Sequence, residues 1–171
     1  MKNKQIIIFI LSLIILYLFF GKGITMKFIK YMKGETWNKL IPEMKTAVTT
    51  TIEDAQSQGL DVMFFEGYRT VERSQEMIDK GVSDLKDARN SDHVWGIGAD
   101  IVVANNLGFP SWPDVTDPRW KKLHDIGAKH GLEFYISWDK PHARLKGYTV
   151  SSLKNDYDNP DDFLKKAGIN V

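Results

Sequence analysis

The chain has 171 residues and a formal net charge of +1, from 23 lysine and arginine residues against 22 aspartate and glutamate residues. This length suits one domain with a sizeable core, and the near balance of charge excludes the broad basic surface of a nucleic-acid-binding protein. The chain has no cysteine, so any zinc site has to use histidine and carboxylate ligands. The composition gives no indication of an oligomer.

The first 25 residues differ in composition from the rest of the chain. After a short basic start, residues 6–20 are almost wholly apolar, with Ser12 and Tyr17 as the exceptions. A helix of this length reaches roughly 25 Å, slightly short of the ~30 Å hydrocarbon core of a bilayer. The segment therefore predicts an apolar N-terminal helix that is either a signal peptide or a short membrane anchor. The two phenylalanines before Gly21 make a poor cleavage site, which favours an uncleaved anchor.

Residues 26–171 are expected to form one domain. Thr36–Gln58 carries apolar residues at three- and four-residue spacing, which predicts a helix that ends at Gly59. The pattern then predicts a strand at Leu60–Tyr68, a helix at Val71–Asp79, a strand at Ile97–Ala104, a loop at Asn105–Pro118, a helix at Arg119–His130, a strand at Glu133–Trp138 and a short helix near Asp161–Ala167. This mixture predicts an α+β fold, a small single domain with a central, mainly antiparallel sheet flanked by helices.

A carboxylate stands at the start of one predicted buried strand. Asp100 leads directly into residues 101–103, an apolar β-branched run, and an ionised Asp there costs several kcal/mol unless it is paired or bound to a metal. His93 lies seven residues upstream, so an unbroken strand would place the two side chains on opposite faces. Gly96 and Gly98 stand between them and can turn the backbone so that both side chains converge.

A second cluster, at residues 138–142, supplies a further histidine and carboxylate. His142 together with His93 and Asp100 would make a three-ligand site with an open fourth position, the usual plan of a catalytic zinc. Asp139 precedes His142 by three residues and remains to act as a general base.

Three motifs follow one another along the chain. They are Gly-Tyr-Arg at residues 67–69, Ser-x-His-x-x-Gly-x-x-x-Asp at residues 91–100 and Asp-x-Pro-His at residues 139–142. In this order they resemble the VanY-type zinc peptidases and, more narrowly, the L-alanyl-D-glutamate endopeptidase branch found among phage endolysins. The resemblance covers about residues 59–148. It implies a zinc peptidase that acts on the peptide stems of bacterial cell-wall peptidoglycan. The L-Ala–D-Glu bond is the favoured target, and a terminal D-Ala–D-Ala bond is the alternative.

The resemblance also implies roles for single residues. A zinc ion would be held by the residues that match the family's ligands, His93, Asp100 and His142. Asp139 matches the general base. Arg69 matches an arginine near the scissile carbonyl, where its permanent charge could stabilise a developing oxyanion.

Three polar residues have both a functional and a structural interpretation. Arg69 could instead be a surface arginine that pairs with Glu66 or Glu72. Gln75 matches a polar position common in the family's next helix, where it would contact substrate, but it could also face solvent. Ser91 could contact substrate or cap a turn through its hydroxyl. Ser91 and Gln75 are therefore predicted to bind substrate.

Two features depart from the family pattern. Gly98 stands where the family usually has alanine, a change that we expect to be neutral. Residues 134–138 lack the Trp-Gly-Gly-rich run that often precedes Asp-x-Pro-His in the endolysin branch. The second departure concerns which peptide bond is cut rather than the metal.

Two other classes of function, and the location of the protein, stay open at this point. A non-catalytic wall-binding module would keep the fold without turnover, although neither a ligand nor the base is missing. A membrane-anchored structural protein would be supported by the apolar N-terminus alone. A peptidase anchored through residues 6–20 has to face the periplasm or cell wall, or be secreted after cleavage. The four lysines at residues 22–33 outnumber the two N-terminal lysines and argue for the reverse orientation.

Overall fold

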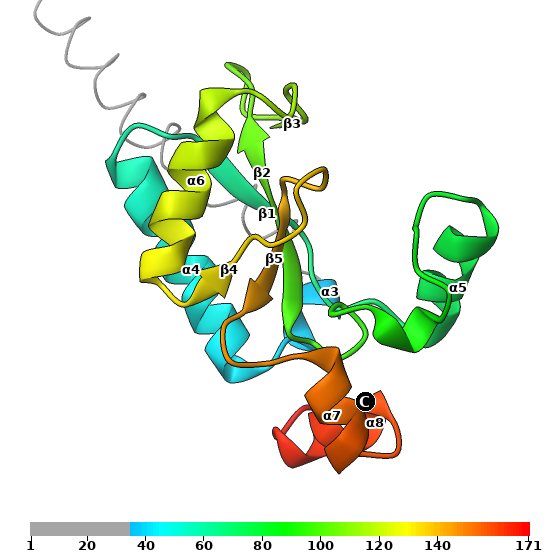
Figure 1. Ribbon diagram of the computed structural model, residues 1–171. Helices are drawn as coiled ribbons and strands as arrows, with labels where there is room; N and C mark the ends of the chain where they lie inside the picture. Colours follow the sequence, from blue (N-terminus) through cyan, green and yellow to red (C-terminus); the bar gives the residue numbers. More distant parts are fainter. Residues whose placement is uncertain (1–34) are drawn as a thin grey trace, which may run out of the picture. The chain divides into compact units, whose positions relative to one another are not determined.

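An antiparallel sheet forms the centre of the described part of the chain, residues 35–171 of the computed structural model (Figure 1). Its strands lie in the order β1-β2-β5-β4, β3 pairs with β2 off this path, and every pairing is antiparallel. The strands are β1 (Val62–Glu66), β2 (Gly98–Ala104), β3 (Pro110–Ser111), β4 (Leu132–Glu133) and β5 (His142–Leu145). The predicted α+β fold with a central antiparallel sheet is confirmed.

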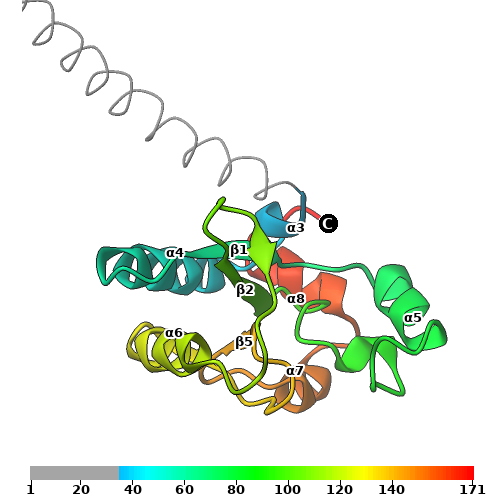
Figure 2. The ribbon, with the colours of Figure 1, turned by 90° about the horizontal axis from the view of Figure 1, so that it is seen from above.

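Helices flank the sheet. They are α3 (Glu35–Asn38), α4 (Pro42–Ser57), α5 (Val71–Asp79), α6 (Pro118–Lys129), α7 (Val150–Asp156) and α8 (Pro160–Lys166), with a short 3-10 helix at Ala88–Asn90. α4 packs against β1, β2 and β5, and α6 packs against α4 and β4. Seen from above in Figure 2, α4 and α6 lie on one side of the sheet and α5 lies on the other.

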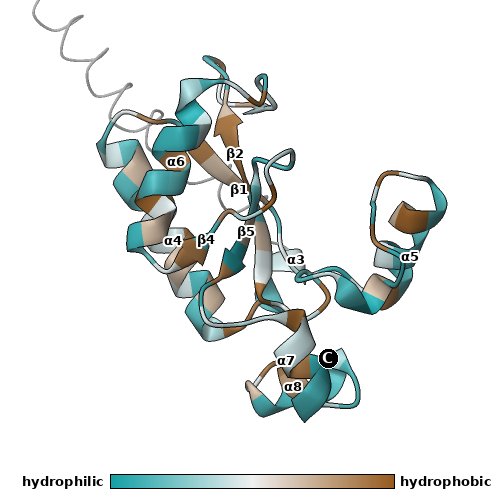
Figure 3. Cartoon of the chain, viewed as in Figure 1, coloured by the Kyte–Doolittle hydropathy of each residue, from teal (hydrophilic) through white to brown (hydrophobic). Residues whose placement is uncertain are grey.

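The two faces of the sheet have different roles. Phe64 of β1 is paired with Ile101 of β2, and Val62 is paired with Val103; all four side chains are buried and form one apolar face. Because side chains alternate along a strand, Asp100 of β2 points to the other face. β2 is hydrophobic over much of its length in Figure 3, whereas the outer surfaces of α4 and α6 are largely hydrophilic. The fold therefore buries one face under helices and presents the candidate ligand on the other.

The helix predicted over Thr36–Gln58 is wrong in one respect, because the chain forms two helices there. Ile41 has an extended backbone, with φ of −64° and ψ of 153°, and separates α3 from α4. The ring of Pro42 disfavours helical backbone at the residue before it, and Pro42 itself starts α4, where its missing N–H costs nothing. Leu40 and Ile41 are buried all the same, which explains why the apolar spacing continues across the break.

The predicted elements of the C-terminal half need a second correction. Of the strand predicted over Glu133–Trp138 only Glu133 lies in a strand, as the second residue of β4, and the next strand, β5, was not predicted. β5 has four residues and Arg144 interrupts its apolar pattern, so it carries little periodicity. The prediction also missed β3 within the Asn105–Pro118 loop and α7, a short polar helix capped by the Thr149 side chain.

The predicted N-terminal segment, residues 1–25, lies outside the described residues. Within residues 35–171, no helix combines the length and the apolar character needed to cross a bilayer.

Candidate metal centre

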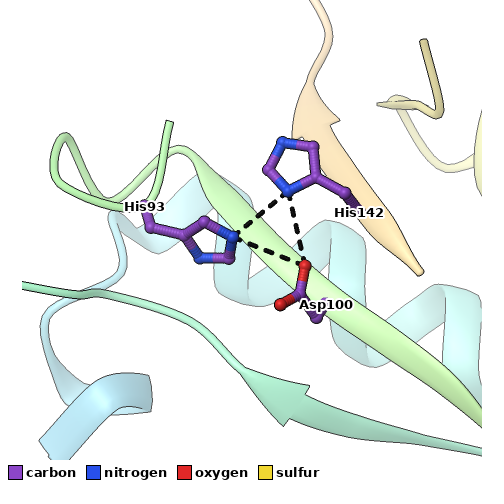
Figure 4. Close-up of side chains that lie close together, drawn as sticks. All are labelled: His93, Asp100 and His142. Carbon is purple, nitrogen blue, oxygen red and sulfur yellow. Dashed lines mark hydrogen bonds and ion pairs between the residues drawn. The ribbon is translucent and has the colours of Figure 1, made fainter. Parts of the chain in front are cut away.

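Three side chains from separate parts of the fold converge on the face of the sheet opposite the apolar core (Figure 4). Asp100 lies in β2 and His142 is the first residue of β5, and the two are paired directly across the sheet. His93 lies in the turn that precedes β2. The chain turns at Gly96, whose φ is +64°, so strand alternation does not apply between His93 and Asp100.

The spacing of the three donor atoms fits a tetrahedral metal site. His93 Nε2 lies 3.1 Å from His142 Nδ1 and 3.4 Å from Asp100 Oδ1, and His142 Nδ1 lies 3.3 Å from the same oxygen. Ligands that are about 2.0–2.1 Å from a zinc ion, at the corners of a tetrahedron, lie about 3.3–3.4 Å from one another. The three atoms therefore match three corners of a zinc tetrahedron and leave the fourth for another ligand.

Both histidines present a nitrogen lone pair to this centre when they are neutral. His93 Nδ1 donates a hydrogen bond to the backbone oxygen of Gly67 at 2.6 Å, which leaves Nε2 as the free nitrogen. His142 Nε2 lies 3.1 Å from Asp92 Oδ2, a carboxylate acceptor, which leaves Nδ1 free. Two lone pairs and a carboxylate oxygen this close together repel one another unless a cation or a proton lies between them. The donor set is therefore that of a cation site.

The electrostatics of the ligands support the same conclusion. Burial raises the pKa of Asp100, but the two histidines outweigh this and hold that pKa well below its ordinary value. Burial lowers the pKa of His142, but hydrogen bonds with Asp100 and Asp92 raise it to about 9. The carboxylate thus stays ionised, and the centre takes up a proton when no metal ion is there.

A tight turn carries Asp139 to the edge of this centre. The His142 N–H donates to the backbone oxygen of Asp139 at 3.2 Å, which closes the turn. The Ile101 N–H donates to the Pro141 oxygen at 3.0 Å and fixes the turn to β2. The turn and the strand that holds Asp100 therefore form one unit.

The surroundings of Asp139 suit a proton carrier. Burial and, next, the negative charge of Asp100 raise the pKa of Asp139, whereas His142, His93 and Arg69 lower it by a smaller amount. A carboxylate with a raised pKa can take up and release a proton closer to neutral pH than an ordinary aspartate.

Arg69 lies beside the turn that carries His93, and its side chain is paired with Glu66. Its Nε and Nη2 atoms contact the Glu66 carboxylate at 3.3 and 2.6 Å, and its side chain is only 10% exposed. The Arg69 N–H donates to the backbone oxygen of His93 at 3.2 Å, so the arginine is fixed to the turn that carries a ligand. Arg69 is therefore paired with Glu66, as the structural interpretation expects, and it also lies beside the ligand turn, as the functional interpretation requires.

The structure treats the two predicted substrate-binding residues differently. Ser91 is buried at the start of the ligand turn. Its backbone N–H donates to the backbone oxygen of Ala88, and its backbone oxygen accepts from the Val94 N–H. Gln75 is exposed on α5, and its amide donates to Asp79 of the same helix at 2.8 Å. No contact described in residues 35–171 joins Gln75 to the three ligands. The substrate-binding role of both residues stays a prediction.

The two other histidines connect structural elements rather than join the site. His124 Nε2 donates to the Lys140 oxygen at 2.9 Å, and its ring stacks on Phe134 with the centroids 4.2 Å apart. His130 Nε2 contacts Asp54 Oδ2 at 2.8 Å and links α6 to α4.

The side chains around His142 were not predicted from the sequence. Asp92 and Tyr135 lie next to His142, and the Tyr135 hydroxyl donates to Asp92 Oδ2 at 2.6 Å. The Arg144 guanidinium in turn lies 4.2 Å from the centre of the Tyr135 ring. The strand period would have placed Arg144 on the same face as His142, but β5 itself was not predicted. No local signal singled out Tyr135.

Gly98, which stands where the family usually has alanine, is closely packed in this chain. A Cβ on Gly98 would lie 2.7 Å from the Cβ of Asp92 and 3.0 Å from the backbone nitrogen of His93. The turn that carries His93 is folded directly onto Gly98, so the absence of a side chain there is a packing requirement.

The comparisons with known proteins point to one family. A model of the phage L-alanyl-D-glutamate peptidase family matches residues 26–140, more than half of the chain. An L-alanyl-D-glutamate peptidase of Listeria phage A118 is 26% identical over 122 residues, which are 68% of this chain and 42% of that protein. The chain thus spans less than half the length of the curated relative that it matches.

Two solved structures share the fold. The Serratia marcescens L-Ala D-Glu endopeptidase ChiX has a TM-score of 0.54 and 19% identity, over 67% of this chain and 86% of that chain. The LD-carboxypeptidase LdcB has a TM-score of 0.50 and 18% identity, over 74% of this chain and 69% of that chain. The structural similarity shows a common fold, and identities this low leave the choice of substrate to other observations.

Proposed function

This chain belongs to the phage L-alanyl-D-glutamate peptidase family, and from that premise we propose that it is a zinc-dependent peptidase that hydrolyses the L-Ala–D-Glu bond in the peptide stems of bacterial peptidoglycan. The family match and the Listeria phage relative both favour this bond over a terminal D-Ala–D-Ala bond.

One observation carries the proposal: three donor atoms, 3.1–3.4 Å apart, meet at the spacing of zinc ligands with an ionisable carboxylate beside them. A structural zinc site would use four protein ligands, whereas three ligands and an open position are the plan of a catalytic one. Asp139 supplies the acid–base group that such a site needs. Neither a wall-binding module nor a structural protein has a use for this combination.

The residues of the chain divide the reaction between them. A zinc ion held by His93, Asp100 and His142 supplies Lewis-acid activation of water and of the scissile carbonyl. The Asp139 carboxylate accepts a proton from the attacking water and delivers it to the amine nitrogen as the carbon–nitrogen bond breaks. Arg69, held by Glu66, contributes a fixed positive charge where negative charge develops on the carbonyl oxygen.

Mass spectrometry of purified muropeptides after digestion with the full-length chain tests this function. Cleavage of the L-Ala–D-Glu bond gives stem peptides that begin with D-Glu and glycan fragments that keep L-Ala. Release of free D-Ala alone would identify the carboxypeptidase instead. Binding to peptidoglycan without any fragment would identify a wall-binding module. The His93→Ala chain and the wild type with a chelator are the controls, and both should be inactive.

We propose further that residues 6–20 hold the protein at a membrane, with residues 26–171 on the side of the cell wall, or that the domain is secreted if the segment is cleaved. The support is the apolar run itself and the location of the proposed substrate outside the membrane.

A further inference from the structure

The Asp92 carboxylate lies on the side of His142 that faces away from the other two ligands. Its Oδ2 atom is 3.1 Å from His142 Nε2, while His142 Nδ1 faces His93 and Asp100. The same Oδ2 accepts a hydrogen bond from the Tyr135 hydroxyl at 2.6 Å. The Asp92 side chain is 2% exposed and that of His142 is 7% exposed, so water has little access to this contact.

The sheet register explains how an acid comes to lie there. Asp100 is paired with His142, and two residues further along the same face Gly98 is paired with Arg144. Because Gly98 has no side chain, Asp92 packs directly against it, in the space that a Cβ would take. The Asp92 backbone oxygen accepts hydrogen bonds from the N–H groups of Ile97 and Gly98, at 3.2 and 3.1 Å, which fixes the backbone from which the carboxylate extends.

Two charged groups complete these surroundings. The Arg144 guanidinium lies over the Tyr135 ring, and its Nη2 atom contacts Glu133 at 3.0 Å. The Asp92 carboxylate therefore faces two donors, His142 Nε2 and the Tyr135 hydroxyl.

We propose that Asp92 is a positioning residue for the metal ligand His142, and that Tyr135 fixes the Asp92 carboxylate. A carboxylate can only accept, so Asp92 keeps the His142 proton on Nε2 and the lone pair on Nδ1, facing the metal. It also makes the imidazole a stronger ligand. Tyr135 connects residues 134–138, which follow β4, to the metal centre. The inference rests on the proposed function only in taking zinc as the metal.

Zinc affinity, measured by competition with a chromophoric chelator, tests the role of Asp92 in the full-length chain. Asp92→Ala should bind zinc about 10–100-fold more weakly than the wild type, the usual effect of losing the partner of a metal-bound histidine. Asp92→Asn keeps an acceptor oxygen and should lose less than about tenfold. Tyr135→Phe should lose less than Asp92→Ala. Asp125→Asn, which removes an exposed carboxylate paired with Lys121 on α6, is the matched control and should bind zinc as the wild type does.

A second readout observes the contact itself. In zinc-loaded wild-type protein, nitrogen–proton correlation spectra should show His142 with a proton on Nε2 that exchanges slowly with water. In Asp92→Ala that proton should exchange much faster, and in Asp92→Asn it should stay protected. If Asp92→Ala does not fold, the wild-type and Asp92→Asn spectra still show whether the His142 proton is held on Nε2.

The outcomes separate the two proposals. Wild-type zinc affinity in Asp92→Ala, or a wild-type spectrum without a protected Nε2 proton, would overturn the role of Asp92 and leave the peptidase proposal standing. A wild-type chain that binds no zinc would overturn both.

Discussion

Asp139 and His142 stand at the two ends of one turn, and the proposed mechanism gives them separate roles, the first in proton transfer and the second in metal binding. The three candidate ligands match three corners of a tetrahedron without Asp139, and burial and the charge of Asp100 raise the pKa of Asp139. This division of labour leads to a prediction for the isosteric amide.

Asp139→Asn keeps the shape of the side chain but cannot take up a proton. We expect zinc content and fold to be retained and the rate of stem-peptide cleavage to fall on the order of 10²–10⁴-fold, the usual contribution of a positioned general base. The acidic limb of the pH–rate profile should disappear with it. Elemental analysis and muropeptide digestion measure both effects. Loss of zinc would make Asp139 a ligand and require another group as the base, and near-wild-type turnover would refute the mechanism.

The proton that replaces the metal gives a second prediction at this scale. Without metal, His142 has a pKa of about 9 in the folded chain, against about 6.5 when unfolded. A raised pKa contributes stability that is complete below about pH 6.5 and is lost as pH rises through about 9. The metal-free protein should therefore become less stable between these values.

Zinc affinity should change in the opposite direction over the same window. Zinc has to displace the His142 proton, so its apparent affinity should rise by up to about tenfold per pH unit as the pH approaches 9. Thermal unfolding with and without a chelator at several pH values measures both effects. His142→Gln should lose the pH-dependent fall in the metal-free state. A zinc affinity that does not change from pH 6.5 to 9 would contradict the assignment of this proton.

At the scale of elements, the ligand turn is built on a glycine of β2. Gly98→Ala would place a Cβ 2.7 Å from the Asp92 Cβ and 2.9 Å from the Asp92 carbonyl carbon, so the turn has to shift. We expect a loss of about 1–3 kcal/mol in the free energy of unfolding, the usual cost of overpacking, together with weaker zinc binding because His93 moves with the turn. Gly108→Ala is the comparison, since a Cβ there meets no atom within 4 Å, although its positive φ adds backbone strain. Unchanged zinc affinity in Gly98→Ala would show that the turn can relax without moving His93.

At the scale of the whole molecule, the domain of residues 26–171 and the apolar N-terminal segment should be separable. Full-length protein should fractionate with membranes and keep its N-terminus, whereas a chain that begins at Lys27 should be soluble and retain activity on muropeptides. This follows because the candidate ligands, the base and the sheet all lie within residues 35–171. Membrane fractionation and N-terminal sequencing test it. Recovery of a secreted form that begins after Gly21 would favour the signal peptide instead.

The sequence determined those elements whose signal is local. Val71–Asp79 was predicted with the bounds that the structure has, because Thr70 caps its start and a glycine follows its end. The three candidate ligands were found for a similar reason, since an acid at the start of a buried strand and a nearby histidine are unusual enough to require a partner. The break before Pro42 was also readable from the sequence, but the continuous apolar spacing obscured it.

Only the tertiary structure decided which groups surround the ligands. Pairing of Asp100 with His142 and of Gly98 with Arg144 depends on the register of β2 and β5, and β5 is too short and too polar to be recognised from its own pattern. The contact of Tyr135 with Asp92 joins residues 43 positions apart, so no local rule could propose it. Sequence patterns report which residues are apolar, charged or able to turn, whereas register and long-range packing decide which of them meet.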